Sequence, residues 1–294
     1  MMRKTILVVV LVAIAESIVA QSFYAIRKNR SLIGVVGTGT STYFGELSNP
    51  GDYFNPDLNL NLGLQYYLTP RFSARTEITW FKTSGDDAKA DHGGRVKRNL
   101  SFKSNNIEVN AVGMINLTPN GNRYYRRPQL NAYAFGGIAL LYFNPTAELN
   151  GSTYALQPLK TEGIAYSRFA FALPFGFGVR KKIGPNSNLA FEWGYRKTFS
   201  DYLDDVSTAY PDLSGYTGPA LALSFRGQEK GLDQPFPVEG QKRGNPETDD
   251  GYMLLSLKFE YYLPFDLNDQ GNGRMYSRKR SASYRYNKRG GLRR

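Results

Sequence analysis

Long stretches of this chain alternate between apolar and polar residues, and this period of two limits the fold more than any other feature. In residues 58–69 a leucine or tyrosine occupies every second position, with mostly asparagine, glycine, glutamine and threonine between them. Successive side chains of a β-strand point to opposite faces, so the pattern predicts strands rather than helices. Because it recurs in a chain that begins with an export signal, we interpret the chain as an outer-membrane β-barrel.

The amino terminus has the features of a cleavable signal peptide, which we assign to residues 1–20. The basic pair Arg3 and Lys4 precedes an apolar run over residues 6–15. This run has about half of the roughly 20 residues that a spanning helix needs, so we expect no transmembrane helix. The chain contains no cysteine, and we therefore expect no disulfide, no cysteine-based metal site and no lipoprotein anchor.

Eight alternating segments predict an all-β fold, an eight-stranded antiparallel transmembrane β-barrel with long extracellular loops and a disordered basic C-terminal tail. The segments cover residues 32–44, 57–69, 71–82, 101–117, 129–143, 166–181, 188–199 and 251–263. Long and short connections alternate between them, as in bacterial barrels with short periplasmic turns, longer outer loops and both chain ends inside. A further alternating stretch, 219–226, is too short to span, and we interpret it as a hairpin extension in the last loop.

The excess positive charge of the chain lies mostly at its carboxyl end. We predict a periplasmic linker at 21–30, the barrel at 31–265 and a basic periplasmic tail at 266–294. The formal net charge is +12, and residues 270–294 contain no acidic residue. Low apolar content and like charges predict disorder, and in the periplasm such a tail would meet acidic protein, anionic lipid or no partner, rather than nucleic acid. Its basic residues are Arg274, Arg278, Lys279, Arg280, Arg285, Lys288, Arg289, Arg293 and Arg294.

Charged residues recur on the strand faces opposite the apolar ones. A charge facing lipid at mid-depth would cost roughly 2 to 4 kcal/mol, so we expect these side chains to point into the lumen. Eight strands enclose a space that side chains just fill, and residues of opposite charge should pair across it. We favour a structural salt-bridge plug over a proton or ion path. The predicted lumen network consists of Arg75, Glu77, Glu108, Glu192, Arg196, Lys258 and Glu260.

An enzymatic site is the first alternative for a barrel with a plugged lumen. Hydrolytic sites usually pair a nucleophile with a histidine base, and the single histidine, His92, lies in a charged loop without a strand to hold it. We interpret it as a solvated loop residue and predict no enzymatic activity, no cofactor and no small-molecule substrate. Hard cations prefer clustered oxygens, but the spacing of Asp201, Asp204 and Asp205 matches no EF-hand loop. Loop solvation or helix capping is the simpler interpretation, and we predict no metal site.

Several segments resemble the PorG-type outer-membrane proteins, which are barrel components of the Por, or type IX, secretion system of Bacteroidetes. They include TYFGEL from Thr42 to Leu47, SGDDA followed by RNLSFKSNNIEVNAV, GIALLYFNP ending at Pro145, and LPFGFGV. The most specific is RKTFSDYLDDVSTAY, from Arg196 to Tyr210. The resemblance covers most of residues 32–265, and its family-motif residues are Asp201, Tyr202, Asp204 and Asp205.

The resemblance implies a non-enzymatic outer-membrane subunit associated with the periplasmic ring of the secretion machine, which a lipoprotein and its partner form. That machine exports proteins to the cell surface and in some species supports gliding. We expect periplasmic turns and the tail to contact the ring, while the wall contacts outer-membrane lipid. Besides the tail, the candidate partner-binding residues are Arg123, Arg126, Arg127, Lys181 and Lys182. The alternative is a stand-alone small barrel of the OmpA or OmpW kind, acting as an adhesin or a narrow solute path.

Overall fold

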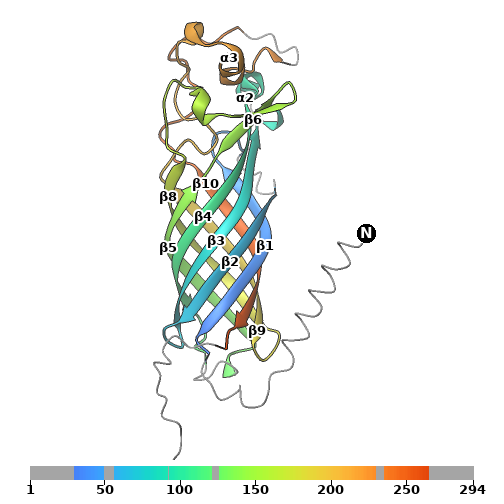
Figure 1. Cartoon of the computed structure of the whole chain (residues 1–294), viewed down its shortest axis with the longest axis vertical. Coiled ribbons are helices and arrows are strands. Elements are labelled where there is room, and N and C mark those ends of the chain that lie inside the picture. Colours follow the sequence, from blue (N-terminus) through green and yellow to red (C-terminus); the bar gives the residue numbers. More distant parts are fainter. Residues whose placement is uncertain (1–29, 50–55, 92, 121–125, 230–234, 265–294) are drawn as a thin grey trace, which may run out of the picture.

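The computed structural model describes residues 30–49, 56–91, 93–120, 126–229 and 235–264. Within these ranges the chain forms a closed antiparallel β-barrel of eight strands, with a cap of loops and short helices at one end (Figure 1). The predicted barrel of eight strands is confirmed. Its strands are β1 (Leu32–Phe44), β2 (Asp57–Tyr67), β3 (Phe72–Asp86), β4 (Ser101–Asn116), β5 (Leu130–Tyr142), β8 (Phe169–Lys182), β9 (Ser187–Thr198) and β10 (Gly251–Tyr262).

Pairing between the first and last strands closes the barrel. β1 pairs antiparallel with β10 from Ile33 opposite Tyr262 to Phe44 opposite Gly251. β5 pairs directly with β8, because the two strands between them form a separate hairpin at the outer end of β4. This hairpin consists of β6 (Pro145–Leu149) and β7 (Ser152–Ala155), in a region that we expected to be a loop. No helix in the described ranges is long and apolar enough to cross a membrane.

The two ends of the barrel differ in the length of their connections. The turns at 68–71 and 183–186 and the described parts of the 117–129 turn lie at the same end as the first and last described residues (Figure 1). The long connections, of which 199–250 is the longest, lie at the opposite end. Following the arrangement of bacterial barrels, we call these the periplasmic end and the outer end.

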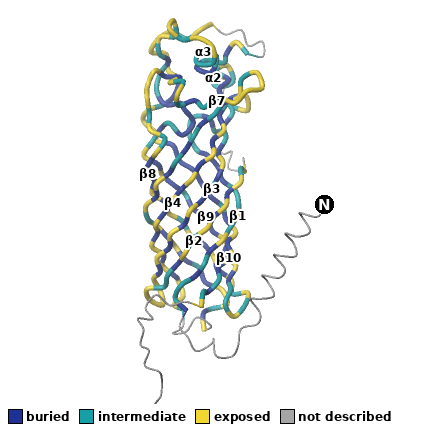
Figure 2. The backbone as a smooth tube through the Cα atoms, in the orientation of Figure 1, coloured by how far each residue is buried: buried dark blue, intermediate teal, exposed yellow. Residues whose placement is uncertain are grey.

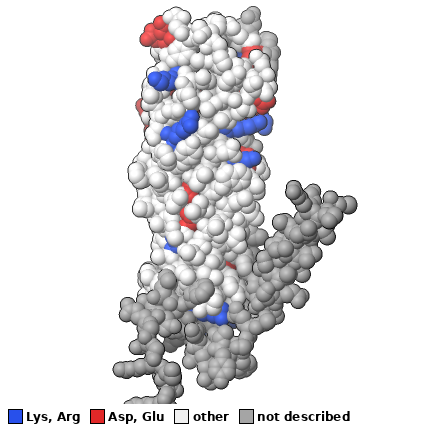
Figure 3. All heavy atoms as spheres, in the orientation of Figure 1, with Lys and Arg blue, Asp and Glu red and all other residues white. Residues whose placement is uncertain are grey.

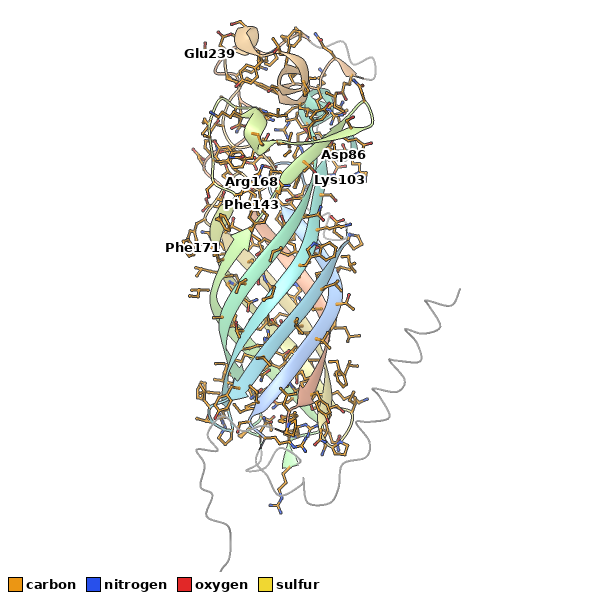
Figure 4. The ribbon with its side chains drawn as sticks, viewed as in Figure 1. Asp86, Lys103, Phe143, Arg168, Phe171 and Glu239 are labelled. Atoms are coloured by element: carbon orange, nitrogen blue, oxygen red, sulfur yellow. The ribbon has the colours of Figure 1, made fainter. Side chains whose placement is uncertain are left out.

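The outer wall of the barrel is apolar along the strands. Leu62, Ile138 and Phe171 have 66%, 65% and 68% of their surfaces exposed, and Phe171 projects from the wall in Figure 4. Figure 2 shows the alternation of buried and exposed positions along the strands, and in Figure 3 most of the visible wall carries no charge. A continuous apolar band of this kind is stable against lipid rather than water, so the wall is that of a membrane-spanning barrel.

Residues 219–224 of the stretch 219–226 lie in a helix, and the predicted hairpin extension there is wrong. α3 (Gly218–Ser224) has Pro219 in its first turn, a position that proline favours, and alanine and leucine are strong helix formers. Leu223 is buried against the cap. The other short elements of the cap are η2 (Asp87–Lys89), α2 (Gly93–Arg98), η4 (Gln157–Leu159) and η5 (Leu213–Gly215).

The largest hydrophobic core lies at the outer end, where the cap meets the barrel. Phe81, Phe102 and Phe143 from the outer ends of the strands pack with Leu203 and Val206 from the long loop. Because this core joins barrel and loop, the part of the 199–250 segment that contains Leu203, Val206 and Leu223 folds onto the barrel mouth.

Candidate functional site

Two basic and two acidic side chains form a closed square of ion pairs inside the barrel. Arg75 Nη1 lies 2.8 Å from Glu192 Oε2, and Arg75 Nε lies 3.2 Å from Glu77 Oε2. Opposite them, Lys258 Nζ lies 2.8 Å from Glu77 Oε1 and 2.7 Å from Glu192 Oε1. All four side chains are buried. Because buried charges need partners, this square both fills and neutralises the lumen at its level.

A second ion pair and an aromatic layer fill the lumen on the outer side of the square. Arg196 Nε lies 3.3 Å from Glu108 Oε2, and the Tyr252 hydroxyl donates to the same oxygen at 2.6 Å. The Tyr252 ring stacks on Phe81, with ring centroids 4.6 Å apart. The polar network therefore continues directly into the hydrophobic core of the outer end.

A third ion pair fills the lumen toward the periplasmic end. Arg180 Nε lies 2.5 Å from Glu260 Oε2, and the Arg180 guanidinium lies 4.6 Å from the centre of the Tyr133 ring. Arg180 is missing from the predicted network, because the neighbouring Lys181 and Lys182 obscure the alternation at the end of β8. With Arg180 the network contains four basic and four acidic residues.

The structure places all seven residues of the predicted lumen network inside the barrel, each in an ion pair. The pairs join strands on opposite sides of the barrel as well as neighbours. Side chains of opposite charge and aromatic rings follow one another from the periplasmic end to the cap. This arrangement can brace the barrel, and an ion or solute could pass only if these pairs separated.

Asp87, a residue that is absent from the predicted sites, is the centre of a group of ion pairs and hydrogen bonds in the cap. We call such a group a node. Arg95 Nε lies 2.9 Å from Asp87 Oδ1, and Arg98 Nε lies 2.7 Å from Asp87 Oδ2. The Leu100 backbone N–H also donates to Asp87 Oδ2, at 3.2 Å. The buried carboxylate thus orients α2 over the outer end of β3 and β4.

A second node contains two of the family-motif residues. The Tyr166 hydroxyl donates to Asp205 Oδ1 at 2.7 Å, and the Tyr202 ring stacks on Tyr166 at 4.7 Å. Arg243 donates to Glu162 Oε1 at 2.8 Å and to the Asp205 backbone oxygen at 2.6 Å. Burial raises the pKa of Asp205 to about 6, although Arg243 opposes the shift. Asp205 and Tyr202 therefore join the connection between β7 and β8 to the 199–250 loop.

The other two family-motif residues lie at a group of buried carboxylates. One carboxylate oxygen from each of Glu46, Asp204 and Asp250 lies within 4.8 Å of the others, and we call these three residues the acidic cluster. Asp201 lies beside it and interacts electrostatically with Glu46 and Asp250. The Tyr43 hydroxyl donates to Asp250 Oδ1 at 2.6 Å. The predicted trio of Asp201, Asp204 and Asp205 is thus divided, because Asp205 belongs to the Arg243 node.

The acidic groups in and beside the acidic cluster outnumber the bases that act on them. Burial, reinforced by Asp201, raises the pKa of Glu46 to about 7. Burial and neighbouring acids raise the pKa of Asp201 to about 7, and burial raises those of Asp204 and Asp250 well above their ordinary values. Arg98 opposes the shifts of Glu46 and Asp204, but its guanidinium is already paired with Asp87.

An open polar pocket of about 490 Å³ lies on the side of the cap, between the ends of β3 and β4 and the β6–β7 hairpin. Its charged groups come from Asp86, Lys89, Lys103, Glu148 and Arg226. Figure 4 shows Asp86 and Lys103 close together at this level. The pocket presents both charge signs to the exterior, which suits a polar surface contact more than an apolar ligand.

The periplasmic rim contains four of the predicted partner-binding residues. Arg126 and Lys181 are exposed, and Lys182 is partly exposed. Arg127 is buried, and it donates to the backbone oxygens of Gly184 and Pro185 at 2.8 and 2.7 Å. Arg127 is therefore engaged by the barrel's own turn, and its docking role stays a prediction. Arg123 and the nine tail residues lie outside the described ranges, as do the signal peptide and residues 21–29.

His92, the residue on which a histidine-dependent enzyme would rest, also lies outside the described ranges. The chain has one histidine and no cysteine. The described residues therefore offer neither a histidine base nor a thiol nucleophile.

A closed barrel with an apolar wall and a filled polar lumen defines a small membrane-spanning β-barrel protein. The chain belongs to the DUF6089 family, whose model, described as a domain of unknown function, matches residues 4–217. No curated protein matches the chain.

Several solved structures are similar to this chain at low sequence identity. The outer membrane protein OprG from Pseudomonas aeruginosa is 9% identical, with 81% of this chain and 100% of that chain covered and a TM-score of 0.41. A major outer membrane protein from Thermus thermophilus is 14% identical, with 80% and 99% covered and a TM-score of 0.40. The N-terminal β-barrel domain of Pseudomonas aeruginosa OprF is 9% identical, with 80% and 98% covered and a TM-score of 0.37.

Proposed function

We propose that this chain is a non-enzymatic outer-membrane component of a type IX protein secretion and gliding machinery, in which it anchors or stabilises a periplasmic ring complex. The observation that carries the proposal is the filled and neutral lumen. Four bases and four acids pair along the barrel, so transport through it would require several buried ion pairs to break. A rigid barrel whose lumen is filled in this way suits a role in anchoring other proteins at the membrane better than a role in transport.

The resemblance to PorG-type proteins is the reason that we propose the type IX secretion machinery in particular. Its segments 42–47 and 196–210 contribute Glu46 and Asp204 to the acidic cluster. The resemblance is therefore strongest in the outer cap, on the far side of the membrane from a periplasmic ring. We accordingly assign ring contact to the rim and the tail.

Charge supports a basic contact surface at the periplasmic end. Arg126 and Lys181 are exposed on the rim, and the tail sequence adds nine basic residues. Such residues recognise acidic protein surfaces and speed association with them. In this proposal the partners are the ring lipoprotein and its partner protein, with the barrel in the outer membrane and the tail in the periplasm.

The test is a crosslinked pull-down from native membranes. It compares the full chain, a chain truncated after Asp269, and a full chain with Arg126→Ala and Lys181→Ala. Loss of ring proteins on truncation assigns docking to the tail, and loss in the double variant assigns it to the rim. Absence of ring proteins from the full-length sample overturns the proposal.

The second candidate is a stand-alone small barrel of the OmpA or OmpW kind that acts as an adhesin. The observation that favours it is the polar pocket on the ordered outer cap, where Lys103 and Glu148 are exposed to the exterior. Binding of the purified barrel to host-cell or matrix surfaces, lost in Lys103→Glu, would support this function. A steady single-channel conductance would instead support the narrow solute path.

A further inference from the structure

We infer that the acidic cluster of Glu46, Asp204 and Asp250 is a calcium-binding site that holds the long outer loop onto the barrel mouth. This inference is independent of the proposed secretion role, because it concerns only the outer end. The three residues come from the turn after β1, from the start of the 199–250 loop and from the position just before β10. One ion would therefore connect three parts of the chain.

The spacing of the oxygens fits a hard divalent cation. Calcium binds oxygens at about 2.3–2.6 Å, so two ligands on opposite sides of the ion lie up to about 5 Å apart. One oxygen from each member of the cluster lies within 4.8 Å of the others. Calcium also accepts irregular geometry and six to eight ligands, whereas magnesium requires a nearly ideal octahedron of smaller radius. Water and the nearby Asp201 can supply the ligands that three carboxylates do not.

The carboxylates are oriented before an ion binds. The backbone N–H of Leu203 donates to Asp250 Oδ2 at 2.9 Å, that of Val206 to Asp204 Oδ1 at 2.9 Å, and that of Asn245 to Glu46 Oε1 at 3.1 Å. Partners of this kind fix the direction of metal ligands and increase affinity.

Unsatisfied oxygens point to a missing positive partner. Asp204 is 1% exposed, and its Oδ2 atom has no hydrogen-bond donor among the described residues. The nearby Tyr43 hydroxyl has a single proton, which it gives to Asp250 Oδ1. Glu46 Oε2 is also buried without a hydrogen bond in the described part of the chain. Buried carboxylates left in this way are strongly unfavourable unless they are protonated or bind a cation.

Arg98, the base whose charge acts on Glu46 and Asp204, does not neutralise the cluster. Arg98 makes two contacts with Asp87, Nε to Oδ2 at 2.7 Å and Nη2 to Oδ1 at 3.0 Å, and it also donates to the Arg243 backbone oxygen. Its charge is therefore shared with another buried carboxylate. At neutral pH a divalent ion would balance the remaining negative charge of the cluster.

The direct test is a calcium titration of the full chain. The chain is refolded in detergent that contains no lipopolysaccharide and is then transferred to chelator-treated buffer. Calorimetry should detect one Ca²⁺ per chain, with a Kd of roughly 10⁻⁴–10⁻³ M as in extracellular calcium modules. Asp204→Asn and Asp250→Asn keep the side-chain shape and should weaken binding about tenfold or more. Asp249→Asn is the matched control, because Asp249 is exposed and adjacent to Asp250, and it should bind as the original chain does.

Two results would overturn the inference. The first is no saturable Ca²⁺ binding by the folded original chain up to roughly 10 mM, far above the expected range. The second is unchanged binding in both Asn variants. If those variants fail to fold, Glu46→Gln replaces them, because Glu46 is only half-buried. The titration of the original chain tests the calcium site independently of any variant. A parallel Mg²⁺ titration should give weaker binding, and tighter Mg²⁺ binding would contradict the assignment to calcium.

Discussion

Arg75 and Glu192 form a two-point contact across the barrel, with Nη1 2.8 Å from Oε2 and Nη2 2.9 Å from Oε1. The two residues are 117 positions apart in the chain. The Nη2 contact is a charge-assisted hydrogen bond, which is short and strong, and the Nη1 contact adds a close electrostatic attraction. The contact thus sets β3 and β9 relative to each other through the lumen.

Glu192→Ala should destabilise the barrel strongly. The change leaves Arg75 and Lys258 with Glu77 as their shared acid, and breaking a buried ion pair in this way costs about 3–5 kcal/mol. Denaturant unfolding in detergent would measure the loss. Lys103→Ala is the control, because Lys103 lies 3.9 Å from Glu148 with 79% of its side chain exposed, and it should change stability by about 0.5 kcal/mol or less. Equal effects of the two substitutions would contradict the structural role of the square.

The intact barrel should show no steady conductance in planar bilayers. Three ion-pair levels and the stacked Phe81 and Tyr252 rings occupy the lumen. Phe81→Ala should likewise show no steady conductance, because the ion pairs beneath the aromatic layer still fill the barrel. A reproducible single-channel current in the original chain would refute the plugged lumen.

Gly45→Ala should disturb the attachment of the outer cap. A Cβ at Gly45 would overlap the Tyr43 hydroxyl and Asp250 Oδ1, so the turn after β1 would have to move. Overpacking of this kind typically costs about 1–3 kcal/mol, measured by thermal or denaturant unfolding. Gly215→Ala is the matched control, since a Cβ there would meet nothing within 4 Å, and it should be neutral.

Calcium removal should open the outer cap to protease. Arg243 is 3% exposed and held by Glu162, so trypsin should cut after it slowly while the long loop is attached. A chelator should increase this cleavage in the original chain, and added Ca²⁺ should reverse it, because a ligand that binds the folded cap stabilises it. In Asp204→Asn cleavage should be fast with or without Ca²⁺. Identical digestion rates in chelator and Ca²⁺ would count against an ion at the acidic cluster.

The neighbouring Arg126 and Arg127 should respond differently to substitution. Arg127→Lys removes the guanidinium N–H groups that donate to the backbone oxygens of Gly184 and Pro185. The free energy of unfolding should therefore fall by about 1–3 kcal/mol. Arg126→Lys should leave stability unchanged, because Arg126 is exposed. Unfolding curves of the two variants test this difference, and equal stability would show that the Arg127 contacts do not hold the turn.

Strand positions followed from the sequence because alternation is a local property. The predicted segments 32–44 and 251–263 agree with β1 and β10 to within one residue at each end. The prediction for 219–226 is wrong because the alternating alanine and leucine of residues 220–223 also suit a helix, and the contacts of Leu223 with the cap decide which structure forms. The β6–β7 hairpin was missed because its short strands have no lipid-facing alternation.

The candidate sites were predicted less completely. Lumen-facing charges could be recognised because lipid forbids them on the other face, but Arg180 was hidden by adjacent lysines. The acidic cluster could not be recognised, because Glu46 and Asp250 are more than 200 positions apart in the sequence. Arg127 looked like its neighbour Arg126, and nothing local indicated that one of them turns into the barrel end.

The sequence by itself determined that this chain spans a membrane as a barrel, because the period of two assigns each strand one face for lipid and one for polar groups. Tertiary structure alone decided which charges meet. Closure of β1 against β10 brings Tyr43 to Asp250, and the curvature of eight strands brings Arg75 to Glu192. These contacts depend on strand register and on the folding of a long loop, which no local pattern specifies.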